Sequence, residues 1–435
     1  VMGSLFVAKR MGMENLISFD MGGTTAKACI VEHGRVTLAT EYEVGAGLNV
    51  GHRLLRGGGY VVRVPILDIA EVGAGGGSIA WIAPGGILKV GPQSAGASPG
   101  PVCYGQGGTE PTVTDANVVL GYLNPAYLAG GALKLNAEAA RRAVVEQIAQ
   151  PLGLDPVEAA YGIHRIANAM MVRALRAVSI ERGRDPRKFP LFAFGGSGPV
   201  HAAHLAQEME MSRIVVPQAP GLFSSFGLLF SDLEHHYVQT FWHRFTEEAV
   251  DDANRALAAM ATDARRDLAR EGYGDGRVVI QAMADLRYVG QNSELSIHLP
   301  SETLERAGLA ALREAFESEH ETTYGYRSPK EPVQFVNLRL VARGLEERRS
   351  RVPGVPAASG RSASLPSGPS RRPAFFGPAL GWVETAVIGR ERLGSGWEAG
   401  PLIIEEYDSA TVVPPGCRVA RDEWGNILVD VAKTP

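Results

Sequence analysis

The sequence has little cysteine, little net charge and no long apolar run. Its three cysteines, Cys29, Cys103 and Cys417, lack metal-ligand spacing, and any disulfide pairing leaves one over, so a reducing cytoplasm is the expected setting. A net charge of −4 with 21% charged residues gives no reason to expect a nucleic-acid partner or a polybasic membrane anchor. No apolar stretch reaches the ~18 residues of a membrane span, and no signal peptide is recognisable. We therefore expect small molecules or proteins as partners.

Glycine, in contrast, is abundant. There are 52 glycines in 435 residues, well above the usual ~7%. They cluster between apolar segments, at 57–59, 73–77, 105–108, 130–131 and 195–198. Such clusters indicate loops shaped around a ligand more than flexible linkers. A chain of this length can bury a large core and is expected to hold two or three domains.

The chain is organised around residues 16–32, LISFDMGGTTAKACIVE, which predict two short strands, 16–19 and 28–31, joined by a polar tip. Backbone amides and threonine hydroxyls at this tip can surround phosphate oxygens, while Asp20 can hold a magnesium ion directly or through water. The tip residues are Gly22, Gly23, Thr24 and Thr25. An ordinary hairpin whose Asp caps a turn is the alternative, and this motif alone does not separate the two.

A second candidate lies in DIAEVGAGGGSIAWI, where a strand delivers Asp68 and Glu71 to a glycine-rich loop and a second strand follows. The loop amides can approach an anion, with the two carboxylates beside them as holders of metal-bound water or as a general base. The candidate contacts in the loop are Gly75, Gly76, Gly77 and Ser78. A glycine-rich turn with solvated acids is the alternative.

A third candidate is a strand at 190–194, a Gly-Gly-Ser-Gly turn and a helix from near Pro199. A helix N-terminus behind such a turn offers free amides to the phosphate or ribose of a nucleotide. The turn residues are Gly195, Gly196, Ser197 and Gly198. His201 and His204 share a face of this helix, but no third ligand is evident, so metal binding is not favoured.

Three further residues lie in or beside helices expected at 136–151 and 155–182 and the irregular segment 91–117. Cys103 is expected to be a packed thiol rather than a nucleophile, because the sequence places no histidine to activate it. Asp115 can cap the next helix or contact a ligand, with neither role favoured. Asn168, polar within an apolar stripe, is a possible substrate contact.

The chain divides into four predicted segments. Residues 1–232 read as an α/β core. Residues 233–344 read as an α+β subdomain, in which Arg287 is a candidate substrate contact although packing explains it more simply. Residues 345–372 are rich in Arg, Ser, Pro and Gly and are expected to be a solvated linker. Residues 373–435 show short strands with turns and are expected to form a separately folded, small all-β domain.

Together these stretches resemble the ATP-dependent hydantoinase A / 5-oxoprolinase family, within the actin-like ATPase (ribonuclease H-like) fold. The matching pieces, in one order over nearly the whole chain, are FDMGGTTAK, DIAEVGAGGGSIAWI, GPQSAGASPGPVCYGQGGTEPTVTDAN, FAFGGSGPVHAAHLA, DLRYVGQNSEL and IIEEYDSATVVPPG. The resemblance implies that residues 20–25 form a phosphate hairpin for ATP and Mg²⁺, and that residues 195–198 form the adenosine-side loop. It also implies ring-opening hydrolysis of a cyclic amide such as a hydantoin, 5-oxoproline or a lactam. This chain would be the ATP-binding, carbonyl-phosphorylating subunit beside a hydantoinase B-like subunit.

One departure from the family's pattern concerns an earlier lobe that carries its own D-x-G-G-T hairpin. Nothing in this sequence corresponds to that lobe, so we expect either a truncated protein, with one lobe of the fold, or a lobe supplied by another polypeptide. Either way, the chain alone is expected to bind ATP weakly. Two alternatives remain open, the ATP-binding subunit of an acetone or acetophenone carboxylase and a nucleotide-binding protein without turnover.

Overall fold

The computed structural model describes residues 1–39, 42–44, 48–49, 60–62, 66–345 and 370–431. Contacts between residues divide the chain into two compact units. The first comprises Val1–Ile180, Asp185–Leu229 and the described part of Pro353–Pro435, and the second comprises Glu181–Arg184 and the described part of Phe230–Val352. Of the linker predicted over 345–372, residues 346–369 lie outside the described residues.

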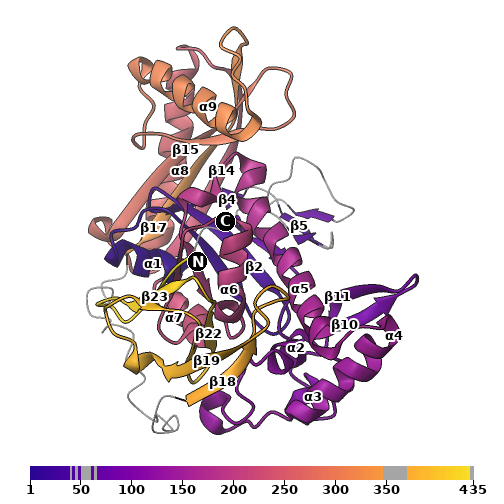
Figure 1. Ribbon diagram of the computed structural model, residues 1–435. Coiled ribbons are helices and arrows are strands. Elements are labelled where there is room, and N and C mark those ends of the chain that lie inside the picture. Colours follow the sequence, from indigo (N-terminus) through magenta and orange to yellow (C-terminus); the bar gives the residue numbers. More distant parts are fainter. Residues whose placement is uncertain (40–41, 45–47, 50–59, 63–65, 346–369, 432–435) are drawn as a thin grey trace. The chain divides into compact units, whose positions relative to one another are not determined.

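A mixed sheet of ten strands forms the centre of the first unit, with β1 (Leu16–Met21) and its hairpin partner β2 (Ala26–Glu32) inside it (Figure 1). Across the sheet the strands are β20 (Glu398–Ala399), β23 (Arg418–Arg421), β24 (Ile427–Asp430), β13 (Arg213–Val216), β12 (Leu191–Phe194), β1, β2, β9 (Ala70–Val72) and β6 (Leu48–Asn49), and β3 (Arg35–Val36) also pairs with β2. Five of the six β1 residues are buried, and Asp20 is the partly exposed one. Because β12 runs parallel to β1, the end of β12 and the hairpin tip lie at the same edge of the sheet.

Three smaller strand pairs among the described residues are separate from this sheet. They are the hairpin of β10 (Ser78–Ala83) and β11 (Ile87–Ser94), the pair of β4 (Leu38–Ala39) and β8 (Ile66–Leu67), and the pair of β5 (Tyr42–Val44) and β7 (Tyr60–Val62). The β10–β11 hairpin follows the glycine-rich loop 73–77, so this loop connects a strand of the central sheet to a separate hairpin.

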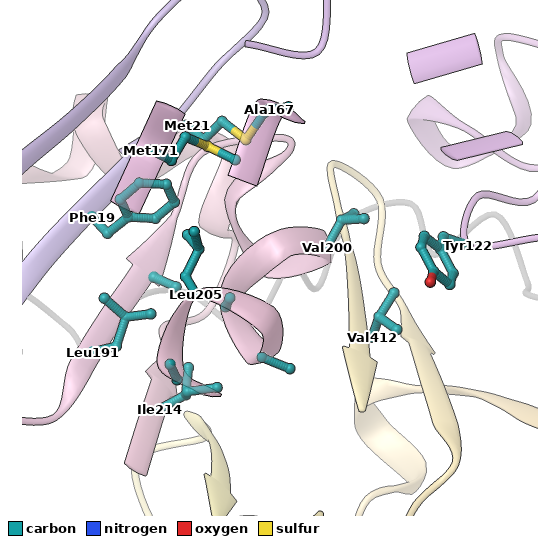
Figure 2. Close-up of a cluster of buried hydrophobic side chains, with 14 of the residues drawn as sticks. Phe19, Met21, Tyr122, Ala167, Met171, Leu191, Val200, Leu205, Ile214 and Val412 are labelled. Atoms are coloured by element: carbon teal, nitrogen blue, oxygen red, sulfur yellow. The ribbon is translucent and has the colours of Figure 1, made fainter. Parts of the chain in front are cut away.

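Helices of the first unit supply much of its core. They are α1 (Met2–Arg10), α2 (Val113–Val119), α3 (Ala137–Val144), α4 (Gln150–Leu152), α5 (Pro156–Val178), α6 (Gly198–Glu208) and α7 (Phe223–Leu228). The longest, α5, begins where the Asp155 carboxylate accepts a hydrogen bond from the Val157 amide at 2.8 Å and Pro156 fixes the first turn. Its buried residues Ala167 and Met171 lie beside Met21 of β1 (Figure 2). The helix expected over 155–182 thus ends four residues early, and the one expected over 136–151 contains a π turn at Val145–Ala149.

The C-terminal strands do not form the separate domain that the sequence predicts over 373–435. Strand β24 pairs antiparallel with β13, so it extends the central sheet. A second sheet, of β18 (Ser370–Phe375), β19 (Trp382–Gly389), β21 (Leu402–Glu405) and β22 (Ala410–Val413), shares the core of the first unit. Figure 2 shows Val412 of β22 beside Val200 of α6 and Tyr122. Short segments of alternating apolar and polar residues predict that strands form. They do not indicate which other strands these strands pair with.

The second unit is an antiparallel sheet with two helices. Its strands are β14 (Leu233–Arg244), β17 (Val333–Gly344), β15 (Val278–Tyr288) and β16 (Leu295–His298), in that order. The helices α8 (Ala249–Arg270) and α9 (Leu309–Tyr324) contribute Leu257, Leu268 and Phe316 to a core with Leu286 and Phe335 of the strands. The second unit therefore combines helices with an antiparallel sheet, an α+β arrangement. Among the described residues, no helix is both long and apolar enough to cross a membrane.

Candidate functional site

The β1–β2 hairpin ends in a tight polar tip. The Gly22 amide donates to the Thr25 carbonyl at 3.1 Å and closes the turn. Gly23 and Thr24 are exposed, and their backbone amides have no hydrogen-bond partner in the part of the chain that the structure describes. Asp20 is partly exposed beside the tip and accepts a hydrogen bond from the Ser224 hydroxyl at 2.8 Å. The tip therefore presents two N–H donors and a hydroxyl next to a carboxylate.

The second glycine-rich segment, the loop 73–77, packs directly on this tip. The Gly76 amide donates to the Gly22 carbonyl at 3.0 Å, and the Gly77 amide donates to the Gly23 carbonyl at 2.6 Å. A Cβ atom on Gly75 would lie 2.5 Å from the Gly23 carbonyl carbon and the Thr24 nitrogen. Only glycine allows this approach of one backbone to the other.

Ser78 holds the loop rather than facing a ligand. It is buried, and its hydroxyl oxygen accepts a hydrogen bond from the Gly75 amide at 2.8 Å. We therefore assign Ser78 a structural contact, although the sequence suggested an anion contact.

The third glycine-rich segment reaches the hairpin from the side of β12. Gly195 has φ +84°, and a Cβ there would lie 2.5 Å from Asp20 Oδ1. The Ser197 amide donates to the Met21 carbonyl at 3.0 Å, which fixes the start of α6 to β1. The structure thus brings together three segments, 20–25, 75–77 and 195–198, that are far apart in the sequence.

A row of charged side chains crosses the sheet beside the tip. Asp20, Lys27 and Glu71 lie directly opposite one another on β1, β2 and β9. Lys27 Nζ contacts Glu71 Oε1 at 3.2 Å and donates to Thr25 Oγ1 at 2.9 Å. Sequence reasoning missed Lys27, yet its position two residues after Thr25 on a strand places both on one face of the sheet. This row puts a cation between two carboxylates next to exposed amides.

Asp68, the other predicted carboxylate, is not brought to the tip. In the β2–β9 ladder, Val72 lies opposite Ala26 and Ala70 opposite Ala28, so Asp68 lies further from the tip than Glu71. Its side chain is buried, and its amide donates to the Thr37 carbonyl at 2.9 Å. The geometry therefore supports Glu71 and not Asp68 as a residue beside the tip.

Asp115 is a buried cap. Its carboxylate accepts hydrogen bonds from the Cys103 amide at 2.7 Å, the Val102 amide at 3.1 Å, and the amide and hydroxyl of Thr112 at 2.9 and 2.8 Å. These contacts form a capping box at the start of α2 and fix the preceding loop. Of the two roles left open by the sequence, the structure has the cap.

Cys103 is fully buried, and burial together with the nearby Asp115 carboxylate raises the pKa of its thiol. A thiol with a raised pKa is a poor nucleophile. This environment agrees with a packed side chain.

The other two candidate substrate contacts are Asn168, in the first unit, and Arg287, in the second. Asn168 is fully buried, and its Oδ1 lies 2.6 Å from His201 Nδ1. Arg287 belongs to the second unit, where its guanidinium lies 4.6 Å from the ring centre of Trp242. Among the described residues, no three His, Cys, Asp or Glu side chains gather as a metal-ligand group, His201 and His204 included.

A segment between β21 and β22 completes the loop cluster, and sequence reasoning did not place it there. The Ser409 hydroxyl donates to the Gly196 carbonyl at 3.2 Å. The Leu222 amide donates to Asp408 Oδ2 at 3.2 Å, and burial raises the pKa of Asp408. The motif IIEEYDSATVVPPG contains Asp408 and Ser409 and marked this segment as part of the family pattern. Because residues 373–435 were expected to form a separate domain, the segment was not placed at the site.

Comparison with known proteins gives this site a family context. Residues 1–237 match the family model described as Hydantoinase/oxoprolinase, and residues 243–429 match the model of its C-terminal domain. The chain is 39% identical to the caprolactamase subunit alpha of Pseudomonas jessenii, over 96% of this chain and 58% of that protein. It is 33% identical to the acetophenone carboxylase gamma subunit of Aromatoleum aromaticum, over 99% of this chain and 58% of that protein.

The same likeness extends to three dimensions. The crystal structure of the ATP-dependent caprolactamase from Pseudomonas jessenii matches with a TM-score of 0.82 at 37% identity, over 99% of this chain and 60% of that chain. The chain therefore spans about three fifths of the length of these relatives. Since the first family model alone covers more than half of the residues, the chain belongs to the hydantoinase/oxoprolinase family.

Proposed function

We propose that this chain is the ATP-binding, carbonyl-phosphorylating part of an enzyme that opens a cyclic amide by ATP-dependent hydrolysis. The observation that carries the proposal is the convergence of three glycine-rich segments on the hairpin tip beside Asp20. The 39% identity to a caprolactamase subunit supports a lactam, a hydantoin or 5-oxoproline as the substrate class.

The topology of the first unit supports an actin-like ATPase fold, which is built on the ribonuclease H-like arrangement. Strands β1, β2 and β9 form an antiparallel meander, and β12 and β13 follow on the other side of β1, each parallel to its neighbour. In that fold the phosphate-binding hairpin is the turn between the first two strands. Here the turn is the polar tip at Gly22–Thr25.

The residues at the tip fit ATP and Mg²⁺. The exposed amides of Gly23 and Thr24 and the hydroxyl of Thr24 are donors suited to phosphate oxygens. Asp20 is the carboxylate placed to hold Mg²⁺ directly or through water. Lys27 adds a positive charge on the same side of the sheet, where it can neutralise charge on a transferring phosphoryl group.

An amide carbonyl is a poor electrophile, and ATP supplies the phosphoryl group that makes its oxygen a leaving group. The residues of this chain bind and orient the phosphates and balance their charge. Glu71 lies beside Lys27 and is the carboxylate available to orient a reacting group, because Asp68 is buried away from the tip. We further propose a hydantoinase B-like subunit as the partner for the hydrolytic step, a partner polypeptide or segment that supplies the second lobe of the nucleotide cleft, and a cytoplasmic setting.

The 33% identity to an acetophenone carboxylase subunit keeps a second candidate, the ATP-using subunit of a ketone carboxylase. Both candidates use the same ATP site and differ in the acceptor. The test is phosphate release from ATP and Mg²⁺ with caprolactam, hydantoin, 5-oxoproline, acetone and acetophenone, with and without a hydantoinase B-like partner. Stimulation by a cyclic amide supports the first candidate, and stimulation by a ketone only, with bicarbonate present, supports the second. No release under any condition contradicts both.

A further inference from the structure

Four buried polar side chains join three helices behind the candidate site. Asn117 belongs to α2, His164 and Asn168 to α5, and His201 to α6, and each is 3% exposed or less. His164 Nδ1 lies 2.8 Å from Asn117 Oδ1, Asn117 Nδ2 lies 3.1 Å from His201 Nε2, and His201 Nδ1 lies 2.6 Å from Asn168 Oδ1. The two imidazole rings are stacked, with their centres 4.4 Å apart. The four side chains therefore form one continuous hydrogen-bonded network.

The network has a single direction. Burial lowers the pKa of both His164 and His201, so each ring is neutral and has one donor and one acceptor nitrogen. With the amides as they stand, His164 donates to Asn117, Asn117 donates to His201, and His201 donates to Asn168. The opposite direction requires both amides to turn together, so the network responds as a unit.

The network is not explained by packing alone. The Nδ2 of Asn168 is buried and has no hydrogen-bond partner among the described residues. Leaving a buried donor unpaired is costly, and apolar side chains of similar volume would fill the same space without that cost. What hydrogen bonds add over apolar contacts is a fixed distance and orientation between the elements that they join.

The network lies on a closed circuit that includes the candidate site. Asn117 is one turn after Thr114, whose amide and hydroxyl both donate to the Gly76 carbonyl at 2.8 Å. His201 is one turn after Ser197, whose amide donates to the Met21 carbonyl at 3.0 Å. The circuit closes because the Gly76 amide donates to the Gly22 carbonyl, in the residue next to Met21.

The two helix starts are also adjacent at the site itself. The hydroxyl oxygens of Thr114 and Ser197 would each lie 2.8 Å from a Cβ atom on Gly76. Gly76 therefore lies against the starts of both α2 and α6 and is hydrogen-bonded to the hairpin tip.

We propose that Asn117 and His201, braced by His164 and Asn168, are positioning residues that hold α2 and α6 at the distance that shapes the loops around the hairpin tip. The part of this proposal that concerns ATP rests on the proposed function. The part that concerns loop positions does not.

The test is amide hydrogen exchange on the full chain, read at Gly76 and Ser197. Asn117→Leu removes both central hydrogen bonds with little change in volume. His201→Gln keeps an acceptor near the position of Nε2 and serves as the conservative variant. His204→Gln is the matched control, because His204 is on the same helix, outside the network, with Glu208 Oε1 at 3.7 Å.

In Asn117→Leu we expect exchange at Gly76 and Ser197 to be about tenfold faster, with His201→Gln closer to wild type and His204→Gln unchanged. Unchanged exchange at these two amides, or acceleration spread evenly over the first unit, overturns the proposal. Calorimetric titration with ATP and Mg²⁺, on the chain with its partner subunit, should show a similar fold-loss of affinity in Asn117→Leu. If the wild type binds no ATP, the proposed function fails, while the exchange result still decides whether the network positions the loops.

Discussion

Lys27 lies directly opposite Asp20 in the β1–β2 ladder, so the ammonium and the carboxylate project from the same face of the sheet beside the hairpin tip. Its ion pair with Glu71 at 3.2 Å is partly exposed on both sides. An exposed ion pair adds only about 0–1 kcal/mol to stability. Breaking this ion pair so that Lys27 can contact a phosphate oxygen therefore costs little free energy, which suits a residue that binds a charged ligand.

Replacing Asp20 tests the tip as the site of metal-bound phosphate. We expect Asp20→Asn to lower ATP turnover about a hundredfold or more, because charge stabilisation through a metal ion is worth several kcal/mol. The melting temperature should change little, since Asp20 is partly exposed and its carboxylate accepts a hydrogen bond from the exposed Ser224 hydroxyl. Glu146→Gln, on an exposed helical position, is the control. Wild-type turnover in Asp20→Asn would contradict the assignment, and a large loss of stability would favour a structural role.

Replacing Lys27 separates charge neutralisation from packing. In Lys27→Met we expect kcat for phosphate release to fall about a hundredfold, with the free energy of unfolding within about 1 kcal/mol of wild type. Lys27→Arg should recover part of the rate, because the charge is kept while the donor geometry changes. Steady-state kinetics and urea unfolding measure the two quantities. Equal rates in Lys27→Met and Lys27→Arg would show that the charge is not what matters.

Gly75 tests the close approach of the loop to the tip. A Cβ there meets backbone atoms of Gly23 and Thr24 at 2.5 Å, so Gly75→Ala must displace the loop or the tip. We expect a loss of about 1–3 kcal/mol in the free energy of unfolding together with weaker ATP binding. Gly274→Ala is the control, because no heavy atom lies within 4 Å of the corresponding Cβ. Similar stability in the two variants would mean that the two backbones are not in contact in solution.

Asp115 separates a cap from a ligand contact. Asp115→Ala leaves the amides of Val102, Cys103 and Thr112 without their acceptor, and we expect a loss of about 2–4 kcal/mol in stability. Asp155→Ala, which removes the cap of α5 with its single side-chain hydrogen bond, should cost about 1 kcal/mol. Thermal unfolding measures both. A stable Asp115→Ala variant with impaired substrate binding would restore the ligand role.

The buried histidines predict how stability depends on pH. Burial, and then the neighbouring His204, lower the pKa of His201 to about 3, below the ~6.5 of an unfolded chain. Between these values the unfolded state binds more protons, so the free energy of unfolding falls as pH falls from about 6.5 toward about 3. Urea unfolding between pH 7 and pH 4 should show this slope, and His201→Gln should make it shallower. An identical slope in both proteins would contradict the prediction. Besides His201, the titratable and charged groups to consider are His164 within the network and His204, Tyr122, Tyr161, Arg165 and Glu208 around it.

Local sequence patterns predict the hairpin, the glycine-rich loops and the long helix well. Apolar runs on either side of the turn at Gly22 and Gly23 predict β1 and β2, and Asp155 followed by Pro156 marks the start of α5. Residues two apart in an extended chain share a face, so the sequence places Lys27 beside Thr25. The ion pair of Lys27 with Glu71 depends on the pairing of β2 with β9, which the sequence does not show. The hairpin, the loops and the helix depend on contacts within a few residues, which is the range over which sequence patterns act.

Features that depend on distant contacts were not predictable in the same way. Asp68 and Glu71 are equally acidic and three residues apart, and only the register with β2 shows that one of them faces the tip region. The sequence leaves Asp115 open between a cap and a ligand contact, and the choice needs the amides of Val102 and Cys103, which donate to it. Strand β13 precedes the second unit in the sequence and β24 follows it. Nothing in the residues near either strand indicates that the two strands pair.

That pairing has a consequence for synthesis on the ribosome. The edge of β13 stays unpaired until Ile427–Asp430 has left the exit tunnel, because no described strand other than β24 occupies it. The second unit is almost wholly one continuous segment, so it can fold while the β13 edge is still unpaired. A nascent chain stalled after this unit carries an open edge next to buried apolar strands, which is a template for pairing with other chains. Chaperone binding to such a stalled chain should therefore concentrate on residues 191–216 rather than on the second unit.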